Sequence, residues 1–171
     1  QVRTDPGGTI ALKAGSQISL FGTLEAPAGK ILLDIESYTL GEPFEPNRFV
    51  WLGGNSRLLA QGFARTQANN QGLIQGEVLR GGEINVNAPL QVAYLVAEAG
   101  SVMDVSGVSA TLDIPQQSNA GVSYRRDTIA GDAGVVNLAM SNMLLDGTLK
   151  GAAAGEHARG GSLILSTPVM V

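Results

Sequence analysis

Short runs in which apolar and polar residues alternate recur along the whole chain, separated by glycine, asparagine, serine or proline. Alternation with a period of two residues places one set of side chains on one face, which is the pattern of a half-buried β-strand. No window shows a capped apolar stripe with the helical period of about 3.6 residues, so we expect almost no helix. The pattern predicts short strands at 9–13, 17–21, 30–35, 49–52, 57–61, 83–87, 91–97, 102–106, 135–138, 142–146 and 162–166.

One outline of seven residues occurs four times: serine, any residue, an apolar residue, any residue, an apolar residue, any residue, glycine. The copies are SQISLFG at 16–22, SRLLAQG at 56–62, SVMDVSG at 101–107 and SNMLLDG at 141–147. Their starts lie 40, 45 and 40 residues apart (56−16, 101−56, 141−101), and such a period is typical of a repeat architecture. We expect each copy to be a strand that ends at an equivalent corner, with its apolar residues stacked in common ladders. The side chains expected in the core are Ile18, Leu20, Leu58, Met103, Val105, Met143 and Leu145.

A second pattern places a glycine pair before an alternating apolar run, in GGTIAL at 7–12, GGEINV at 81–86 and GGSLIL at 160–165. Glycine adopts backbone conformations that a Cβ atom would penalise, so each pair predicts a corner directly before a strand.

Short strands, glycine corners and a continuous apolar face together predict an all-β fold, a parallel β-helix (β-solenoid). A coil of three short strands and three turns holds about 20 residues, so we interpret the 40-residue period as two coils. The rival architecture is a β-propeller, whose blades also repeat at about 40 to 45 residues. It is disfavoured because no Trp-Asp signature recurs and aromatic residues make up only 5% of the chain.

Three polar stretches interrupt the alternation, at 36–48, 65–80 and 113–132. We interpret them as loops that project from one β-helical segment spanning 1–171.

The composition narrows the choice of partners. Of the 171 residues, 11 are basic and 15 acidic, so the formal net charge is −4 and there is no basic patch for nucleic acid. There is no cysteine, and no apolar run approaches the ~20 residues of a membrane-spanning helix. The chain has no visible signal peptide and ends on the apolar STPVMV, so we expect it to be a segment of a longer protein.

Four phrases carry a family resemblance: GGTIALKAGSQISLFGTLEAPAGKILLD, VWLGGNSRLLAQGFAR, YLVAEAGSVMDVSGVSATLDIP and MLLDGTLKGAAAGEHARGGSLIL. In this order they resemble the large filamentous-haemagglutinin-type exoproteins of Gram-negative bacteria, the substrates of two-partner secretion. The resemblance covers nearly the whole chain. The family's N-terminal secretion motifs are not matched, which points to the repetitive shaft.

This resemblance implies a right-handed parallel β-helix that is secreted to the bacterial cell surface and serves as an adhesin or filament. The partners it implies are an outer-membrane transporter during export and host or surface glycans. Because a solenoid cut within its shaft exposes unpaired strands, we also expect the segment to contact adjacent coils or to stack end to end with its own copies.

Candidate chemistry is sparse, and we expect neither an enzyme nor a metal or cofactor. The possible surface-binding residues are Tyr124, Arg125 and Arg126 in the longest polar stretch. Asp127 and Asp132 lie near the arginine pair, but their spacing matches no calcium loop, so we interpret them as solvated loop residues. The alternative function is a polysaccharide lyase or hydrolase on the same fold, which would need carboxylates or a basic residue to converge in one groove.

The remaining candidates have simpler interpretations. The only histidine, His157, adjoins Glu156 in a stretch rich in alanine and glycine, which is typical of a solvated turn. We expect Asp34, Asp104 and Asp146 to face outward into solvent. Phe49 and Trp51, with Phe44 nearby, are predicted to pack a loop onto the body, whereas for Tyr38 and Tyr124 packing and sugar stacking both remain open.

Overall fold

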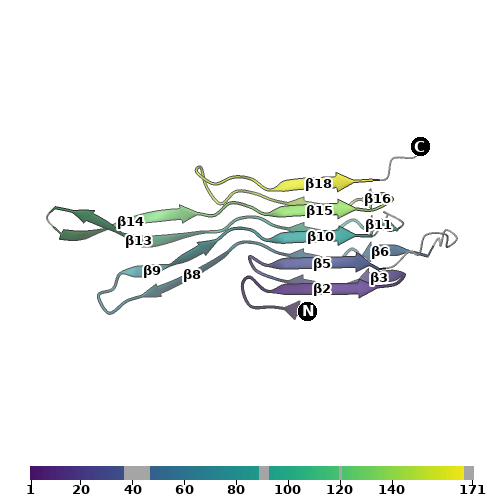
Figure 1. Ribbon diagram of the computed structural model, residues 1–171, viewed down its shortest axis with the longest axis horizontal. Helices are drawn as coiled ribbons and strands as arrows, with labels where there is room; N and C mark the ends of the chain where they lie inside the picture. The colour runs from purple at the N-terminus through teal and green to yellow at the C-terminus, as the bar shows by residue number, and fades with distance from the viewer. Residues whose placement is uncertain (37–46, 89–92, 120, 168–171) are drawn as a thin grey trace.

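The computed structural model describes residues 1–36, 47–88, 93–119 and 121–167, and all regular elements in these ranges are β-strands (Figure 1). The all-β prediction is therefore confirmed. The described residues contain no helix that is long and apolar enough to cross a membrane.

Most strands belong to three parallel sheets. Sheet A has the order β1 (Val2–Arg3), β4 (Thr23–Glu25), β7 (Arg57–Leu59), β12 (Val102–Asp104) and β17 (Thr148–Lys150). Sheet B has the order β2 (Thr9–Ala14), β5 (Lys30–Ile35), β10 (Glu83–Asn87), β15 (Val135–Ala139) and β18 (Ser162–Ser166). Sheet C has the order β3 (Gln17–Leu20), β6 (Phe49–Leu52), β11 (Tyr94–Ala97) and β16 (Asn142–Leu145).

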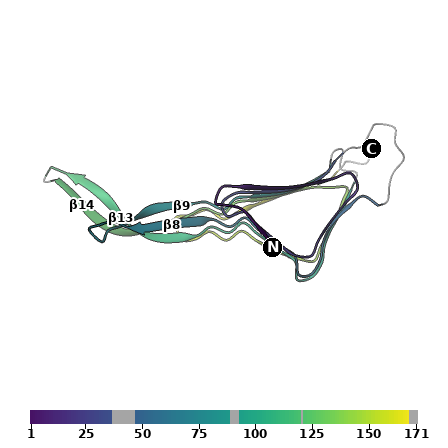
Figure 2. The ribbon, with the colours of Figure 1, turned by 90° about the horizontal axis from the view of Figure 1, so that it is seen from below.

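The chain passes from sheet B to sheet C to sheet A and then returns to sheet B one strand further along. Each strand in these sheets pairs with strands one turn earlier or later and not with its neighbour in sequence. Seen end on, the three sheets form the sides of a triangle (Figure 2). This arrangement is compatible with a β-solenoid.

The core fills the triangle with aligned apolar side chains. In sheet B, Ile10, Ile31, Ile84, Val136 and Leu163 occupy one continuous register position on successive strands. Ile31 and Ile84 in the middle strands are fully buried. Because each turn covers the apolar face of the turn before it, burial depends on stacking and not on any single coil.

Strand positions were predicted well. The strands at 30–35, 49–52, 83–87 and 162–166 have the expected bounds, and each of the other predicted strands differs at one end. Part of the strand predicted at 91–97 lies outside the described residues. The short strands β1, β4 and β17 were missed because two or three residues are too few to show alternation.

The expectation that the four serine-to-glycine outlines end at equivalent corners is wrong. The copies at 16–22 and 141–147 supply strands of sheet C, whereas those at 56–62 and 101–107 supply strands of sheet A. Ile18 is therefore aligned with Val50, while Leu58 is aligned with Met103. One outline fits two sheets because each of these strands is bounded by a polar turn on one side and a glycine corner on the other.

The burial predicted within these outlines is confirmed for four of the seven side chains, and the other three are partly buried. Ile18, Leu58, Met103 and Val105 are buried. Leu20, Met143 and Leu145 lie on the first and last strands of sheet C, are partly buried and pack against the core.

The interpretation of the period as two coils is also wrong. Successive strands of sheet B start 21 (30−9), 53 (83−30), 52 (135−83) and 27 (162−135) residues apart. The longest turns contain insertions at the corner between sheets A and B, so a single turn, and not two, already exceeds the 40-residue spacing.

Two of those insertions are hairpins and not the loops predicted at 65–80 and 113–132. They comprise β8 (Phe63–Ala68) with β9 (Ile74–Leu79), and β13 (Ser109–Ser118) with β14 (Gly121–Ala130), each pair antiparallel. The hairpins were missed because both of their faces carry polar residues, which hides the alternation. Most of the third expected loop, 36–48, lies outside the described residues.

A column of glycines marks the corner where each turn enters sheet B. The carbonyl oxygens of Gly8, Gly29 and Gly82 accept hydrogen bonds from the first backbone N–H of the next strand in that sheet, at 2.9, 2.9 and 3.0 Å. A Cβ atom at Gly29 would overlap the carbonyl oxygen of Gly8, and one at Gly82 would overlap that of Gly29. The corners predicted from the glycine pairs are thus confirmed, because no other residue leaves room for the backbone of the adjacent turn.

We predict that Gly82→Ala lowers the free energy of unfolding by about 2 kcal/mol or more, because the obstructing atoms are backbone and the stacked turns must separate. Gly15→Ala is the matched control, since a Cβ atom there meets no heavy atom within 4 Å. The control should change stability by less than about 0.5 kcal/mol. Urea unfolding followed by circular dichroism measures both variants, and equal effects would contradict the proposed role of the column.

We also predict that both hairpins are dispensable for folding of the three sheets. In the first turn, sheets A and B are joined by the four residues Ala26–Pro27–Ala28–Gly29. Deleting 62–80 leaves Ala60–Gln61–Gly81–Gly82 at the equivalent corner, and deleting 107–132 leaves a corner of the same length. The double deletion should retain a cooperative thermal transition and a β-type far-ultraviolet spectrum. Loss of cooperativity would show that the hairpins belong to the folding core.

Candidate functional site

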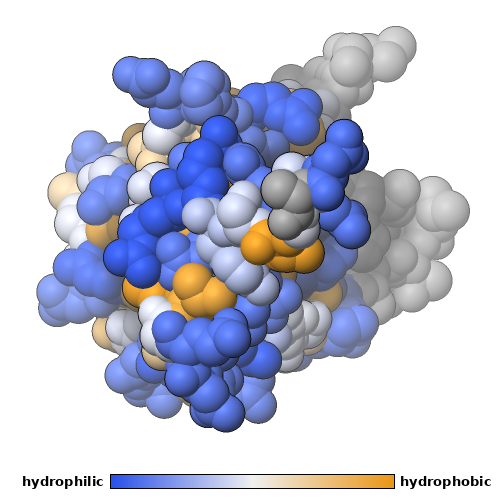
Figure 3. All heavy atoms as spheres, turned by 90° about the vertical axis from the view of Figure 1, so that its left-hand side faces the viewer, coloured by the Kyte–Doolittle hydropathy of each residue, from blue (hydrophilic) through white to orange (hydrophobic). Residues whose placement is uncertain are grey.

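The two hairpins form a projection that we call the arm, which consists of β8, β9, β13 and β14. It leaves the triangular body at the corner between sheets A and B (Figure 2). Within the arm, β13 lies against β9. Viewed toward its end, the surface is mainly hydrophilic and is interrupted by small apolar patches (Figure 3). We place the candidate binding surface on this polar projection, which leaves a body with an apolar core.

Asp113 joins the two hairpins. Its carboxylate is only 6% exposed and accepts two hydrogen bonds from the guanidinium of Arg126 on β14, at 2.9 and 3.0 Å. The same carboxylate accepts the backbone N–H of Ile74 at the start of β9, at 2.6 Å. Paired, bidentate charges of this kind hold a defined geometry. The arm is therefore braced by a side chain and not only by its backbone.

The electrostatics of this joint follow from those contacts. The hydrogen bonds from Arg126, and then the N–H of Ile74, hold the pKa of Asp113 below its usual value. The reciprocal contact raises the pKa of Arg126. Both groups therefore stay charged at neutral pH.

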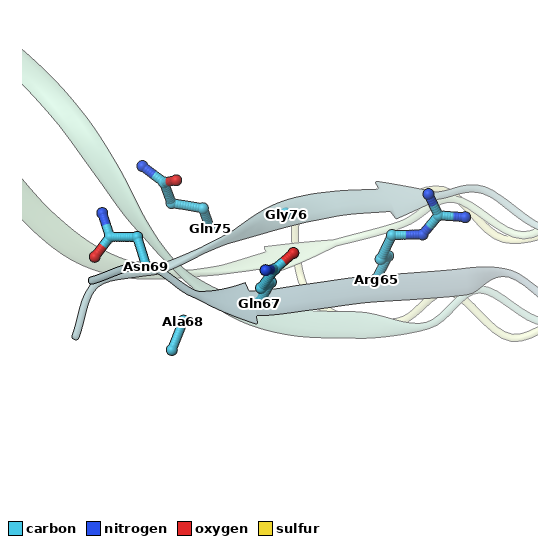
Figure 4. A pocket seen from close by; sticks show the side chains of 6 residues that line it. All are labelled: Arg65, Gln67, Ala68, Asn69, Gln75 and Gly76. Carbon is cyan, nitrogen blue, oxygen red and sulfur yellow. The ribbon is translucent and has the colours of Figure 1, made fainter. Parts of the chain in front are cut away.

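The outer surface of the first hairpin contains a depression of about 290 Å³ (Figure 4). Arg65 and Gln67 line it from β8, Gln75 and Gly76 from β9, and Ala68 and Asn69 complete it near the turn. Gln67 and Gln75 are directly opposite each other in the register. We call this depression the β8–β9 groove.

The groove is rich in hydrogen-bond donors. Asn69 Oδ1 accepts the backbone N–H groups of Gln71 and Leu73, at 2.9 and 3.0 Å, so only its Nδ2 group remains to donate. Within the described residues, the side chains of Arg65, Gln67 and Gln75 have no hydrogen-bond or ion-pair partner. The groove therefore presents a guanidinium and three amide groups to solvent.

The sequence pattern does not single out these residues, because it predicts only a polar loop at 65–80. The usable signal was the polar residues at every second position before and after the Asn-Asn-Gln-Gly turn at 69–72. Alternation of this kind on both sides of a turn is typical of a β-hairpin.

Tyr124, Arg125 and Arg126, the residues proposed for surface binding, lie in strand β14 and not in a loop. Alternation separates Arg125 from the other two, since Arg126 contacts Asp113 on the face that it shares with Tyr124, whereas Arg125 contacts Asp127 on the other face, at 2.7 Å. Tyr124 is 43% exposed and is opposite Pro115. The three side chains therefore do not form one site.

The candidate acids are also kept apart. Asp127 lies on the arm, whereas Asp132 lies at its base and accepts the backbone N–H and the Nε–H of Arg159, at 2.8 and 3.2 Å. The N–H of Arg159 is the main cause that lowers the pKa of Asp132. Glu156 and His157 are exposed in the connection between β17 and β18. In the part of the chain that the structure describes, no group of three or more His, Cys, Asp or Glu side chains could hold a metal ion.

The expectation that Asp104 is a solvated, outward-facing residue is wrong. It is 5% exposed, and its carboxylate accepts the Gln61 amide at 2.8 Å and the backbone N–H of Ser106 at 2.9 Å. It therefore organises the corner from which the second hairpin leaves. Asp34 and Asp146 are half-buried.

Phe49 and Trp51 lie on β6 in sheet C. Trp51 is 37% exposed and makes edge-on contacts with Phe21 and Phe49, with ring centroids 5.9 and 6.4 Å apart. These rings pack against one another on the body, away from the arm. Tyr38 and Phe44 lie outside the described residues.

Comparison of the chain with protein-family models, with curated proteins and with solved structures finds no match.

We predict that the joint between the hairpins weakens in acid. Because the folded pKa of Asp113 is depressed, its stabilising contribution is complete above the unfolded value of about 3.9 and is lost as pH falls through the lower folded value. Protection of the Ile74 amide against hydrogen exchange, measured by NMR, should therefore fall below about pH 4.

The substitution Asp113→Asn should reduce that protection about tenfold at neutral pH, because the charge-assisted bonds to Arg126 are lost. The control is Asp127→Asn, which removes the exposed ion pair to Arg125 and should leave Ile74 unchanged. If the two substitutions act alike, Asp113 does not brace the arm.

Proposed function

We propose that this chain is a structural and adhesive segment of a secreted bacterial surface exoprotein of the filamentous-haemagglutinin type. In this proposal the three sheets are a shaft and the arm is the part that meets a binding partner. The observation that carries it is the division between a body of stacked parallel strands and a polar arm that leaves one corner. The resemblance in the four quoted phrases supports the same assignment.

We propose further that the three sheets form a right-handed parallel β-helix. From each strand of sheet B the chain crosses through sheets C and A. It then forms the next strand of sheet B, parallel to the first and beside it. Crossovers of this type are right-handed in nearly all proteins, because strands of L-amino acids twist in one sense.

A shaft continues at its ends, and the exposed apolar groups of the last described turn support this role. Leu163 and Leu165 occupy core positions of β18, yet they are 49% and 53% exposed. We propose that 1–171 is one segment of a longer solenoid, in which a further coil or a second copy covers these residues. Sedimentation of the isolated chain at increasing concentration would detect end-to-end stacking, and a strictly monomeric species would contradict it.

The remaining parts of the proposal are location and partners. We propose secretion to the cell surface through an outer-membrane transporter, with surface glycans as the class of ligand met by the arm. The absence of cysteine is consistent with export of an unfolded chain, since no preformed disulfide loop would obstruct a narrow pore.

The test is labelling of intact cells of the organism that encodes the chain. An antibody raised against the 171-residue chain should label intact cells, and brief protease treatment of those cells should remove the signal. A cytoplasmic protein serves as the control for membrane integrity. Labelling only after permeabilisation would contradict the proposed function.

A further inference from the structure

We propose that the β8–β9 groove binds a carboxylate-bearing saccharide, with Arg65 holding the carboxylate and the amides of Gln67 and Gln75 binding hydroxyl groups. This inference rests on the proposed adhesive function, for which it names the ligand class and the site.

Hydrogen-bond donors outnumber acceptors in the groove. The guanidinium of Arg65 carries five N–H donors in a planar fork, which matches the two oxygens of a carboxylate. The Oδ1 atom of Asn69 is already occupied by two backbone N–H groups, so its free Nδ2 adds a further donor to the rim. A groove with a surplus of donors fits a ligand rich in acceptors, and an anionic one best.

The side chains that line the groove are mostly polar. Ala68 is the only apolar side chain among the residues that form the groove, and in Figure 4 it points away from Arg65 and Gln67. Sites for apolar ligands are lined mainly by hydrophobic and aromatic side chains, which this groove lacks. The paired amides of Gln67 and Gln75 can each donate to one hydroxyl and accept from another, as a saccharide requires.

Gly76 lines the groove without contributing a side chain. A Cβ atom there would overlap the backbone carbonyl of Arg65 on β8, so this glycine lets the two strands of the hairpin approach each other closely. Arg65, Gln67 and Gln75 share one face of the hairpin, and the saccharide would lie across that face.

Charge limits the number of anionic groups on the ligand. Glu77 is directly opposite Arg65 in the hairpin register and is exposed, although it does not line the groove. Together with the net charge of −4, it disfavours a densely charged polyanion. The groove therefore fits a saccharide with one carboxylate within its reach.

The experiment is an NMR titration of the 171-residue chain with trigalacturonate, using its fully methyl-esterified form as the uncharged reference. The amide signals of Gln67, Gln75 and Gly76 should shift with saturation, and the ester should bind at least tenfold more weakly because the charge-assisted bonds are lost. Arg65→Ala should weaken binding of trigalacturonate by a similar factor, and Arg65→Lys should recover part of it as a point charge.

The matched control is Arg125→Ala, which removes an exposed arginine from the other hairpin. It should leave the affinity unchanged, and the circular dichroism of every variant should match the parent. The proposal is overturned if trigalacturonate causes no saturable shift at millimolar concentration, if the ester binds equally well, or if Arg125→Ala weakens binding as much as Arg65→Ala. Tighter binding of tetraglutamate than of trigalacturonate would overturn it in favour of an acidic peptide. None of these outcomes bears on surface labelling of intact cells, so the two proposals fail separately.

Discussion

The close approach of backbone to backbone at the glycine corner is the constraint on which the rest of the structure depends. Parallel strands in successive turns are separated by about 4.8 Å, and at this corner the chain has no space for a Cβ atom. The hydrogen bonds accepted by Gly8, Gly29 and Gly82 set the register in which each strand of sheet B begins. Because a slip of one residue would turn every core side chain outward, that register decides which residues are buried.

The same corner also accommodates the insertions. Four residues, Ala26 to Gly29, suffice to cross it in the first turn, whereas the next two turns cross it through hairpins. The flanking backbone pairs in the same way in every case, since Ala26, Ala60 and Val105 all donate their N–H to the following strand of sheet A. The hairpins thus enlarge the surface without changing the core, and the buried carboxylate of Asp113 links one hairpin to the other.

Sequence patterns predicted the body far better than the arm. Strands such as 30–35 and 83–87 carry one apolar and one polar face, so alternation located them. The register between turns was not predictable, because the serine-to-glycine outline describes a strand between two corners without saying which sheet it enters. The β8–β9 groove was missed for a related reason: its residues are polar on both faces, and only the register of the hairpin brings Gln67 opposite Gln75.

This contrast reflects how the two parts are stabilised. The body is held by apolar burial that every turn shares with its neighbours, so each turn must repeat the same inward pattern. The arm is held by local backbone pairing and by specific polar contacts, so its outer side chains are free of that requirement. The short connection at 151–161 is also held by polar contacts, since the carboxylate of Asp132 accepts the backbone N–H and the Nε–H of Arg159. Stacked parallel sheets of this kind separate the residues that specify the core from those on the arm, so a change in what is inserted at one corner alters the surface without altering the core.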